Sequence, residues 1–141
     1  GDLSEGMGKI FIREFMETAI HISCKKGLFL FKKGDITHHF YTLIQGEFRL
    51  TIGDSDQHVY TVRYPGEIFG WSSIVDGSTY SATAVSNKLS ETLRFDRDSL
   101  VALLGRHPES GFLFYKKVAE MLGKRLLECY RIIQRDEMLV H

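Results

Sequence analysis

The chain has 141 residues, and its 18 basic and 18 acidic side chains give a formal net charge of zero. This length suits one domain with its own core, and the hydrophobic fraction of 43% is that of an ordinary globular protein. A balanced charge gives no overall field that would favour nucleic acid or an anionic membrane. The longest strongly apolar run, 27–31, is too short to span a bilayer and no signal pattern opens the chain, so we expect a cytoplasmic protein.

Metal sites and catalytic motifs are not indicated by the sequence. The chain has only two cysteines, Cys24 and Cys129, and this number excludes a disulfide framework and a tetrathiolate metal site; we expect both to be free thiols. His38 and His39 are adjacent, so on a strand they would face opposite sides rather than share a metal. The chain has no Walker loop and no nucleophile elbow. We therefore expect a protein that is not an enzyme and has no metal cofactor.

The first two thirds of the chain predict a helix followed by short strands. Apolar residues recur at helical spacing from Lys9 to Ile22, which predicts an amphipathic helix. Segments rich in β-branched and aromatic residues then alternate with Gly-Asp and Pro-Gly turns, which is typical of an antiparallel barrel or sandwich. The predicted strands are 28–31, 40–44, 47–52, 58–64, 80–85 and 91–95. Residues 53–56 are predicted to form a hairpin loop.

The stretch 65–83 suits a cradle for an anion that lacks its cation. Gly70 lets the backbone approach a ligand closely, and the amides of Ser72 and Ser73 are predicted to be free donors at a helix start. Where a phosphate would require Arg or Lys, the stretch offers only Trp71 and Tyr80. Function therefore depends on what this cradle holds.

Two helices are predicted to close the chain. Asp96 is the expected N-cap of a helix over 97–104, Gly105 its expected end, and Pro108 the expected first-turn residue of a longer helix. In the long helix the apolar residues recur at alternating spacings of four and three, which is typical of a coiled-coil seam. We expect a homodimer through this seam, at Leu122, Leu126 and Ile133; the alternative is a helix that packs only on its own barrel.

Three glycine-anchored segments, 27–35 (GLFLFKKGD), 40–50 (FYTLIQGEFRL) and 65–70 (PGEIFG), occur in this order. Together they resemble the cyclic nucleotide-binding domain, and most of all the sensor half of the Crp/Fnr bacterial transcription regulators. The resemblance covers nearly the whole chain. It implies a mainly β fold, a double-stranded β-helix or jelly roll, with an N-terminal helix and a long C-terminal helix. It also implies a ligand held in the roll against the last helix.

The residues that bind cyclic AMP in this family do not carry over. In members that bind it, a Glu takes the ribose hydroxyl and an Arg takes the cyclic phosphate. Here Trp71 stands at the Glu position and Tyr80 at the Arg position, followed by Ser81 and Ala82. Losing a buried, charge-paired Arg costs about 2–5 kcal/mol, and each ~1.4 kcal/mol is tenfold in affinity. Arg63 on the neighbouring strand is a second source of charge, although we expect it to be exposed.

Three interpretations of the cradle stay open at this point. The first is a small effector other than cyclic AMP, flat or hydrophobic, with a carboxylate or similar group on the serine amides. The second is a true cyclic nucleotide binder with an altered cassette, and the third is a ligand-free dimerisation module in which Trp71 and Tyr80 fill the pocket. The expected ligand-binding residues are Leu50, Tyr60, Gly70, Trp71, Ser72, Ser73, Tyr80, Ser81, Ala82, Cys129 and Tyr130.

The domain organisation follows from the same resemblance. We expect one sensor domain over 1–141, with the roll at about 24–95 and the C-terminal helices at about 96–139. Crp/Fnr regulators bind DNA through a helix-turn-helix domain after the long helix, and no such domain is expected in this chain. Effector binding is expected to shift the dimer seam and so reposition an attached output domain.

Overall fold

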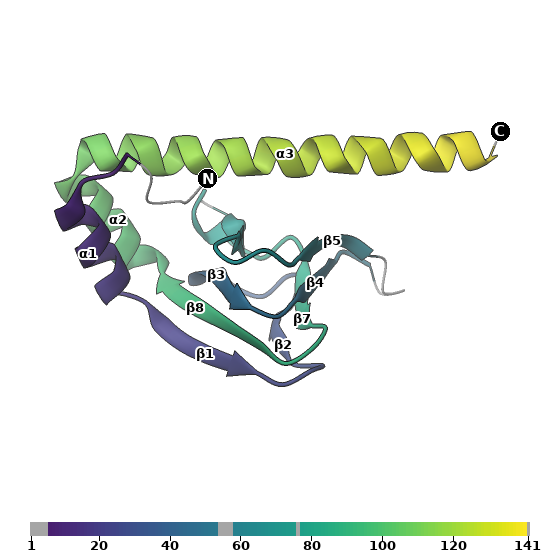
Figure 1. Cartoon of the computed structure of the whole chain (residues 1–141), viewed down its shortest axis with the longest axis horizontal. Coiled ribbons are helices and arrows are strands. Elements are labelled where there is room, and N and C mark those ends of the chain that lie inside the picture. Colours follow the sequence, from purple (N-terminus) through teal and green to yellow (C-terminus); the bar gives the residue numbers. More distant parts are fainter. Residues whose placement is uncertain (1–5, 54–57, 76, 141) are drawn as a thin grey trace.

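The computed structural model describes residues 6–53, 58–75 and 77–140. Within these residues, two antiparallel four-stranded sheets form a roll, and a long helix runs along one side of it (Figure 1). Two shorter helices lie at one end of the roll, beneath the start of the long helix (Figure 1). The mainly β fold with an N-terminal helix and a long C-terminal helix is confirmed. Residues 54–56 of the predicted hairpin loop lie outside the described residues.

Each sheet joins strands that are distant in sequence. One sheet has the order β1 (Ile20–Cys24), β8 (Ser90–Asp96), β3 (His39–Gln45) and β6 (Ile68–Phe69). The other has the order β2 (Phe29–Phe31), β7 (Thr83–Ser86), β4 (Phe48–Thr51) and β5 (His58–Val62). β5 and β7, on either side of the stretch 65–83, belong to the second sheet, whereas β6, inside this stretch, belongs to the first, so the cradle segment connects the two halves of the roll.

The N-terminal helix is shorter than predicted. α1 spans Lys9–Glu17, and the Thr18 hydroxyl donates to the Phe15 carbonyl at 2.7 Å where the helix ends. The chain then enters β1, which pairs with β8 from Ile20 opposite Arg94 to Cys24 opposite Ser90. The predicted helix to Ile22 is therefore wrong beyond Glu17, because sheet pairing overrides the local helical spacing.

One further strand, β6, was not predicted, and one predicted strand begins later than expected. β6 has only two residues, Ile68 and Phe69, which is too short for an alternating pattern to reveal. β7 begins at Thr83 rather than Tyr80, since residues 80–82 belong to the turn that carries the cradle into the sheet. The other predicted strands appear with ends shifted by one or two residues.

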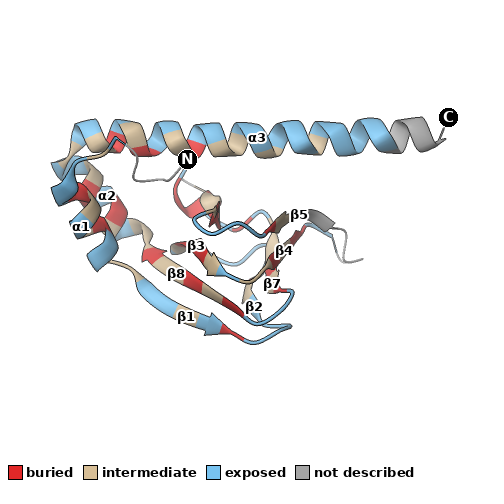
Figure 2. Ribbon diagram, in the orientation of Figure 1, coloured by how far each residue is buried: buried red, intermediate tan, exposed pale blue. Residues whose placement is uncertain are grey.

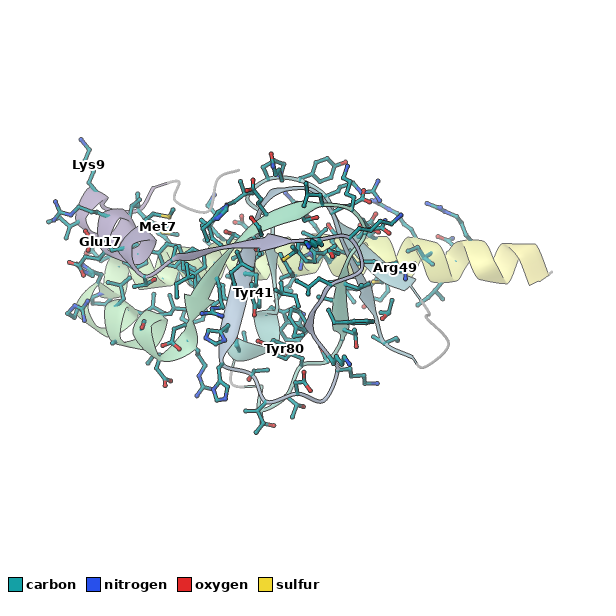
Figure 3. The ribbon with its side chains drawn as sticks, turned by 90° about the horizontal axis from the view of Figure 1, so that it is seen from below. Met7, Lys9, Glu17, Tyr41, Arg49 and Tyr80 are labelled. Carbon is teal, nitrogen blue, oxygen red and sulfur yellow. The ribbon has the colours of Figure 1, made fainter. Side chains whose placement is uncertain are left out.

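The interior of the roll is filled by aromatic rings. Phe31 stacks on Tyr80 with ring centroids 4.0 Å apart and on Tyr41 at 5.7 Å, while Tyr41 stacks on Phe69 at 5.5 Å. Figure 3 shows Tyr41 and Tyr80 pointing into the roll from different elements. The buried members of this interior cluster are Cys24, Phe31, Tyr41, Leu43, Phe48, Leu50, Val62, Phe69, Tyr80 and Ala84.

A second core lies between the first sheet and the helices. β3 is buried on both faces: Tyr41 belongs to the roll interior, whereas Phe40 packs on Phe95 at a centroid distance of 5.0 Å and on Phe15 of α1 at 6.3 Å. The buried members of this helix-side cluster are Phe11, Phe15, Phe40, Ile68, Ile74, Phe95, Leu100, Leu103, Phe114 and Val118. The helices are therefore attached to the roll through one continuous apolar cluster.

The C-terminal helices follow the prediction except at one end. Asp96 caps α2 (Arg97–Arg106) by accepting the Ser99 amide at 3.0 Å, as its position predicted. Gly105 does not end this helix; it lies inside α2, which breaks at His107 before α3 begins at Pro108. Confirming the prediction for Pro108, α3 spans Pro108–Val140. Among the described residues, no helix is both long and apolar enough to cross a bilayer.

The side chains of α3 that are buried among the described residues all lie in its first half. Phe114 and Val118 are buried in the helix-side cluster, and Met121 and Leu122 pack against it. Beyond Val118, the described side chains of α3 are half-buried or exposed, and Figure 2 shows the C-terminal part of the helix extending past the roll. Several apolar side chains beyond Val118, including Leu126 and Ile133, are more than half exposed.

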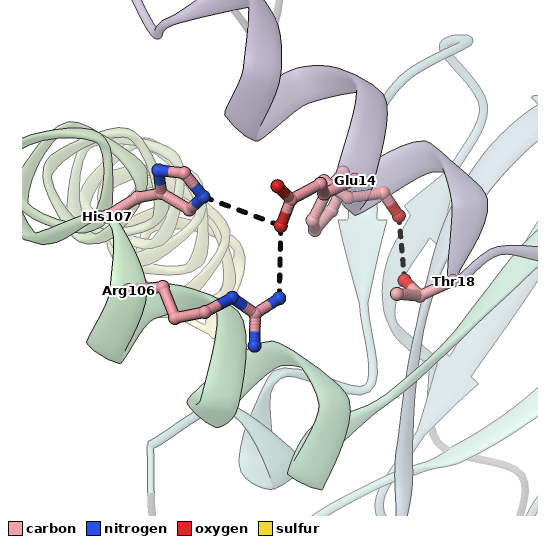
Figure 4. Close-up of polar contacts among 5 residues, drawn as sticks. Glu14, Thr18, Arg106 and His107 are labelled. Carbon is pink, nitrogen blue, oxygen red and sulfur yellow. Dashed lines mark hydrogen bonds and ion pairs between the residues drawn. The ribbon is translucent and has the colours of Figure 1, made fainter.

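A polar contact fastens α1 to the junction of α2 and α3. The Glu14 carboxylate accepts from Arg106 Nη2 at 3.0 Å and lies 3.4 Å from His107 Nε2 (Figure 4). The Arg106 hydrogen bond lowers the pKa of Glu14, and the neighbouring His107 acts in the same direction against the effect of desolvation. This cluster orients the helices at the end of the roll.

Gly46 is predicted to be the most demanding glycine of the roll. It has φ +95°, and an added Cβ would lie 2.6 Å from Ser90 Cα, whereas Gly34 has φ +91° with open space around it. Both changes to Ala cost about 1–2 kcal/mol of backbone strain, and Gly46→Ala adds a further ~1–3 kcal/mol for the clash. Urea unfolding of both variants checks this, and equal midpoints would contradict it.

Glu14→Gln is expected to reduce stability at neutral pH. Because the folded-state pKa of Glu14 is lowered, its contribution is fully present above its unfolded value of about 4.5. The contribution is lost as the pH falls through the folded value, so the difference from the unmodified protein should close in acid. Thermal unfolding between neutral and acid pH measures this. Glu17→Gln, on the exposed side of α1, is the matched control; a pH-independent difference for Glu14→Gln would refute the prediction.

Candidate functional site

The cradle begins at a glycine that no other residue could replace without strain. Gly70 has φ +77°, and a Cβ there would come 3.4 Å from the rings of both Phe31 and Tyr41. A short 3-10 helix, η1 (Trp71–Ser73), follows it and ends at Ile74, which joins the helix-side cluster with Phe114 of α3. The cradle therefore touches both the roll interior and the core beneath the long helix.

The serines of the cradle are bonded within the turn. The Ser73 amide donates to the Gly70 carbonyl at 3.3 Å, and the Ser73 hydroxyl donates to the same oxygen at 3.1 Å. The expectation of a free Ser73 amide is therefore wrong, because the 3-10 turn uses it. Ser72 is buried, and its hydroxyl lies 3.4 Å from that of Ser81, which is exposed. Trp71 is half-buried at the edge of this turn.

Tyr80 is fixed in the core of the roll. Its side chain is 5% exposed, its ring stacks on Phe31, and its hydroxyl donates to the His39 carbonyl at 2.6 Å. Burial raises the pKa of Tyr80, and burial likewise raises that of the neighbouring Tyr41. Both phenols are therefore neutral near pH 7, and the Tyr80 hydroxyl acts as a hydrogen-bond donor rather than as a charged group.

The remaining predicted residues fall into two groups. Leu50 and Tyr60 are cross-strand partners, and Leu50 is also paired with Ala84, next to the half-buried Ala82. These residues lie together with Tyr80 in or beside the roll interior. The two predicted positions on α3 lie apart from that cluster: Cys129 is half-buried, and Tyr130 is 56% exposed.

A cation does lie between the roll and the long helix, but it comes from a residue that the sequence reasoning missed. Arg125 on α3 places its guanidinium 4.7 Å from the centre of the Tyr60 ring, donates from Nη2 to the Ile68 carbonyl, and approaches Glu67 Oε1 at 3.7 Å. The signal was present, because Phe114, Val118, Met121 and Arg125 follow one helical face. A charged residue on a buried face marks a specific contact.

Glu67 holds the turn that faces Arg125. Its Oε1 accepts from the Tyr60 hydroxyl at 2.5 Å, and its Oε2 accepts the amides of Arg63 and Tyr64, both at 2.9 Å. Burial, together with the hydrogen bond to Glu67, raises the pKa of Tyr60 to about 12. Arg63 itself is exposed, as predicted, and contributes its backbone here rather than its charge.

A groove of about 750 Å³ opens along this contact. One wall is the end of β5 with the turn leading into β6, and the other wall is the face of α3 that carries Arg125. The groove therefore lies between the roll and the long helix. Its lining is Tyr60, Tyr64, Pro65, Gly66, Glu67, Ile68, Lys117, Glu120, Met121, Lys124, Arg125 and Glu128.

Metal-binding and redox groups are sparse in the part of the chain that the structure describes. No group of three or more His, Cys, Asp or Glu side chains there could hold a metal ion. Cys24 and Cys129 are free thiols, as predicted, and burial raises the pKa of Cys24, which keeps this thiol protonated and unreactive.

Comparison with known proteins agrees with this geometry. The family model of the cyclic nucleotide-binding domain matches residues 21–107. The cyclic AMP receptor protein of Thermus thermophilus is 32% identical over 101 residues, which are 70% of this chain and 45% of that protein. The chain spans less than half the length of the curated relatives it matches.

Solved structures share the whole arrangement of roll and helices. The Thermus thermophilus catabolite activator protein has a TM-score of 0.74 at 25% identity, covering 96% of this chain and 62% of the other. A cyclic nucleotide-binding domain from Methylobacillus flagellatus has a TM-score of 0.82 at 22% identity, covering 92% and 74%. The chain therefore belongs to the cyclic nucleotide-binding domain family, in the form found in the sensor halves of Crp/Fnr regulators.

Proposed function

We propose that this chain is a regulatory sensor module that binds a small effector other than cyclic AMP or cyclic GMP in the roll. Membership of a ligand-binding family supports a sensor, and one relative carries the name cyclic AMP receptor protein. The Glu and Arg with which cyclic AMP binders of the family hold their ligand are absent from the matching positions of this chain, which carry Trp71 and Tyr80. Catalysis is not part of the proposal.

The observation that best supports this proposal is that Tyr80 is buried and its hydroxyl is already hydrogen-bonded. In cyclic AMP binders of the family an Arg at this position meets the cyclic phosphate. Here the ring is stacked on Phe31 and buried, and its hydroxyl is used by the His39 carbonyl. A phosphate would find neither a cation nor a free donor from this side chain.

The binding free energy lost with the Arg shows how strongly the change to Tyr80 disfavours cyclic nucleotides. Removing a buried charge partner costs about 2–5 kcal/mol, whereas a neutral hydrogen bond returns only ~0.5–1.5 kcal/mol. Tyr80 would also have to give up its present bond to His39 in order to supply one. Micromolar binding in a relative would therefore become millimolar or weaker in this chain.

The proposed effector site combines the cradle with the aromatic interior. Trp71 is half-buried at the edge of the turn, while Leu50, Tyr60 and Ala82 line the adjacent interior. Such a lining suits a flat or hydrophobic molecule with few polar groups. The other predicted contacts, to be tested with it, are Gly70, Ser72, Ser73, Ser81, Cys129 and Tyr130.

One observation favours a second candidate function, a ligand-free dimerisation module. The stack of Phe31, Tyr41, Phe69 and Tyr80 already fills the interior of the roll. Under this alternative Trp71 and Tyr80 are core residues only. The two candidates differ in whether any small molecule perturbs Trp71.

The effect of effector binding is proposed to reach a second copy of this chain through α3. Leu126 and Ile133 are 51% and 57% exposed, and Leu122 lies at the edge of the helix-side cluster. These residues continue one seam along the unpacked half of the helix. DNA contact, as in transcription regulators of this family, would need a domain other than the one described here.

Trp71 is the single tryptophan of the chain and reports directly on the cradle. We expect neither cyclic AMP nor cyclic GMP, up to millimolar concentration, to change its fluorescence or to give saturable heat in calorimetry. Tyr80→Ala, which removes the stacked ring without adding a cation, should also fail to bind. Micromolar binding of either nucleotide to the unmodified protein would reject the proposed class of effector.

The dimer seam can be tested in solution. Leu126→Ala combined with Ile133→Ala removes two exposed apolar side chains and should convert a dimer to a monomer in sedimentation equilibrium. Leu89→Ala combined with Val101→Ala removes exposed apolar side chains away from α3 and should leave the dimer intact. Unchanged association of the α3 variant would place the seam elsewhere.

A further inference from the structure

We infer that the groove between the β5–β6 turn and α3 is a binding site for a small organic anion, with Arg125 as its cation. The groove shares residues 65–68 with the stretch that carries the cradle, but none of residues 70–73, where the cradle was expected to hold its ligand, lines it. The groove also shares Tyr60 with the effector site proposed above. This inference depends on the proposed function only in the premise that a ligand binds next to α3.

Unused donors on Arg125 are the first observation. The side chain is only 11% exposed, and of its three guanidinium nitrogens Nη2 donates to the Ile68 carbonyl. Nε and Nη1 are buried and have no hydrogen-bond partner among the described residues. A buried, unsatisfied donor on a charged group is costly, so such groups are normally bonded. An anion in the groove would supply the missing acceptors.

Glu67 does not fill this role. Its two oxygens already accept from the Tyr60 hydroxyl and from the amides of Arg63 and Tyr64. It forms an ion pair with Arg125 Nη2 at 3.7 Å, which is beyond hydrogen-bond distance and does not involve Nε or Nη1. The carboxylate therefore holds the turn in shape and leaves Arg125 with spare donor capacity.

The other charges of the groove lie on α3. Lys117, Glu120, Lys124 and Glu128 follow one another at spacings of three and four, the spacing at which opposite charges on a helix compensate each other. Arg125 differs from them because its side chain is turned into the contact with the roll. The unsatisfied hydrogen-bond donors thus belong to Arg125. The formal charges of the side chains that line the groove sum to zero.

The walls indicate the rest of the ligand. Tyr64, Pro65, Ile68 and Met121 line the same groove and offer apolar and aromatic surface beside the guanidinium. Arg binds carboxylates and phosphates alike through its planar donors. The ligand class is therefore a small molecule with a carboxylate or phosphate group and an apolar body.

Nuclear magnetic resonance of the full ¹⁵N-labelled chain tests this with sodium benzoate, sodium acetate and sodium phosphate, each exchanged for chloride at constant ionic strength. We expect a saturable shift of the Arg125 Nε–H signal and of the Gly66 and Glu67 amides. Benzoate should saturate at a lower concentration than acetate because its ring contacts the apolar wall. Arg125→Gln should weaken the response of the two amides about tenfold or more.

The control is Arg131→Gln, which removes an exposed arginine from a different face of the same helix and should leave the response intact. Amide signals outside the groove establish that Arg125→Gln is folded; should it unfold, the Nε–H titration of the unmodified protein decides alone. Shifts that do not saturate, or that are equal in both variants, would overturn the site and leave Arg125 as a structural contact. Shifts at Trp71 and Ser72 without any at Arg125 would support the effector site in the roll and refute this one.

Discussion

The stacking of Tyr80 on Phe31 is the interaction on which the interior of this roll depends. It joins the segment that carries the cradle to β2 and, through Tyr41 and Phe69, to the opposite sheet. Because the Tyr80 hydroxyl is bonded to the His39 carbonyl, the ring is fixed in position as well as buried. The interior of the roll is thus closely packed with aromatic and aliphatic side chains, and Tyr80 is a fixed part of this core.

The long helix divides the molecule into a fixed part and a free part. Phe114 and Val118 anchor its first half in the helix-side cluster, and Arg125 makes a polar contact to the β5–β6 turn about two turns further on. Beyond it, large apolar side chains such as Leu126, Leu127 and Ile133 are more than half exposed. A ligand that altered the Arg125 contact would act at the boundary between the packed part and the exposed part of α3. A small change there would alter the direction of the exposed part relative to the roll.

Sequence patterns predicted most strands, the cap at Asp96 and the start of α3, because each depends on local spacing or on one side chain. They failed where distant strands decide the outcome. The helix predicted to Ile22 ends at Glu17, because β1 pairs with β8 from Ile20 onward. The two-residue strand β6 is defined by its pairing with β3. At the candidate site, Gly70 and the cradle were found from their residues, whereas Arg125 was missed because its role requires knowing which helix face meets the roll.

By itself the sequence determined the family frame and the loss of its charged pair, since Trp71 and Tyr80 stand where Glu and Arg would be. Only the tertiary structure decided what those substitutions mean. Whether Tyr80 faces a ligand or the core, and whether a cation reaches the roll, both depend on contacts between segments distant in the chain. Such contacts are set by packing and by competition for hydrogen-bond partners, which no local pattern encodes.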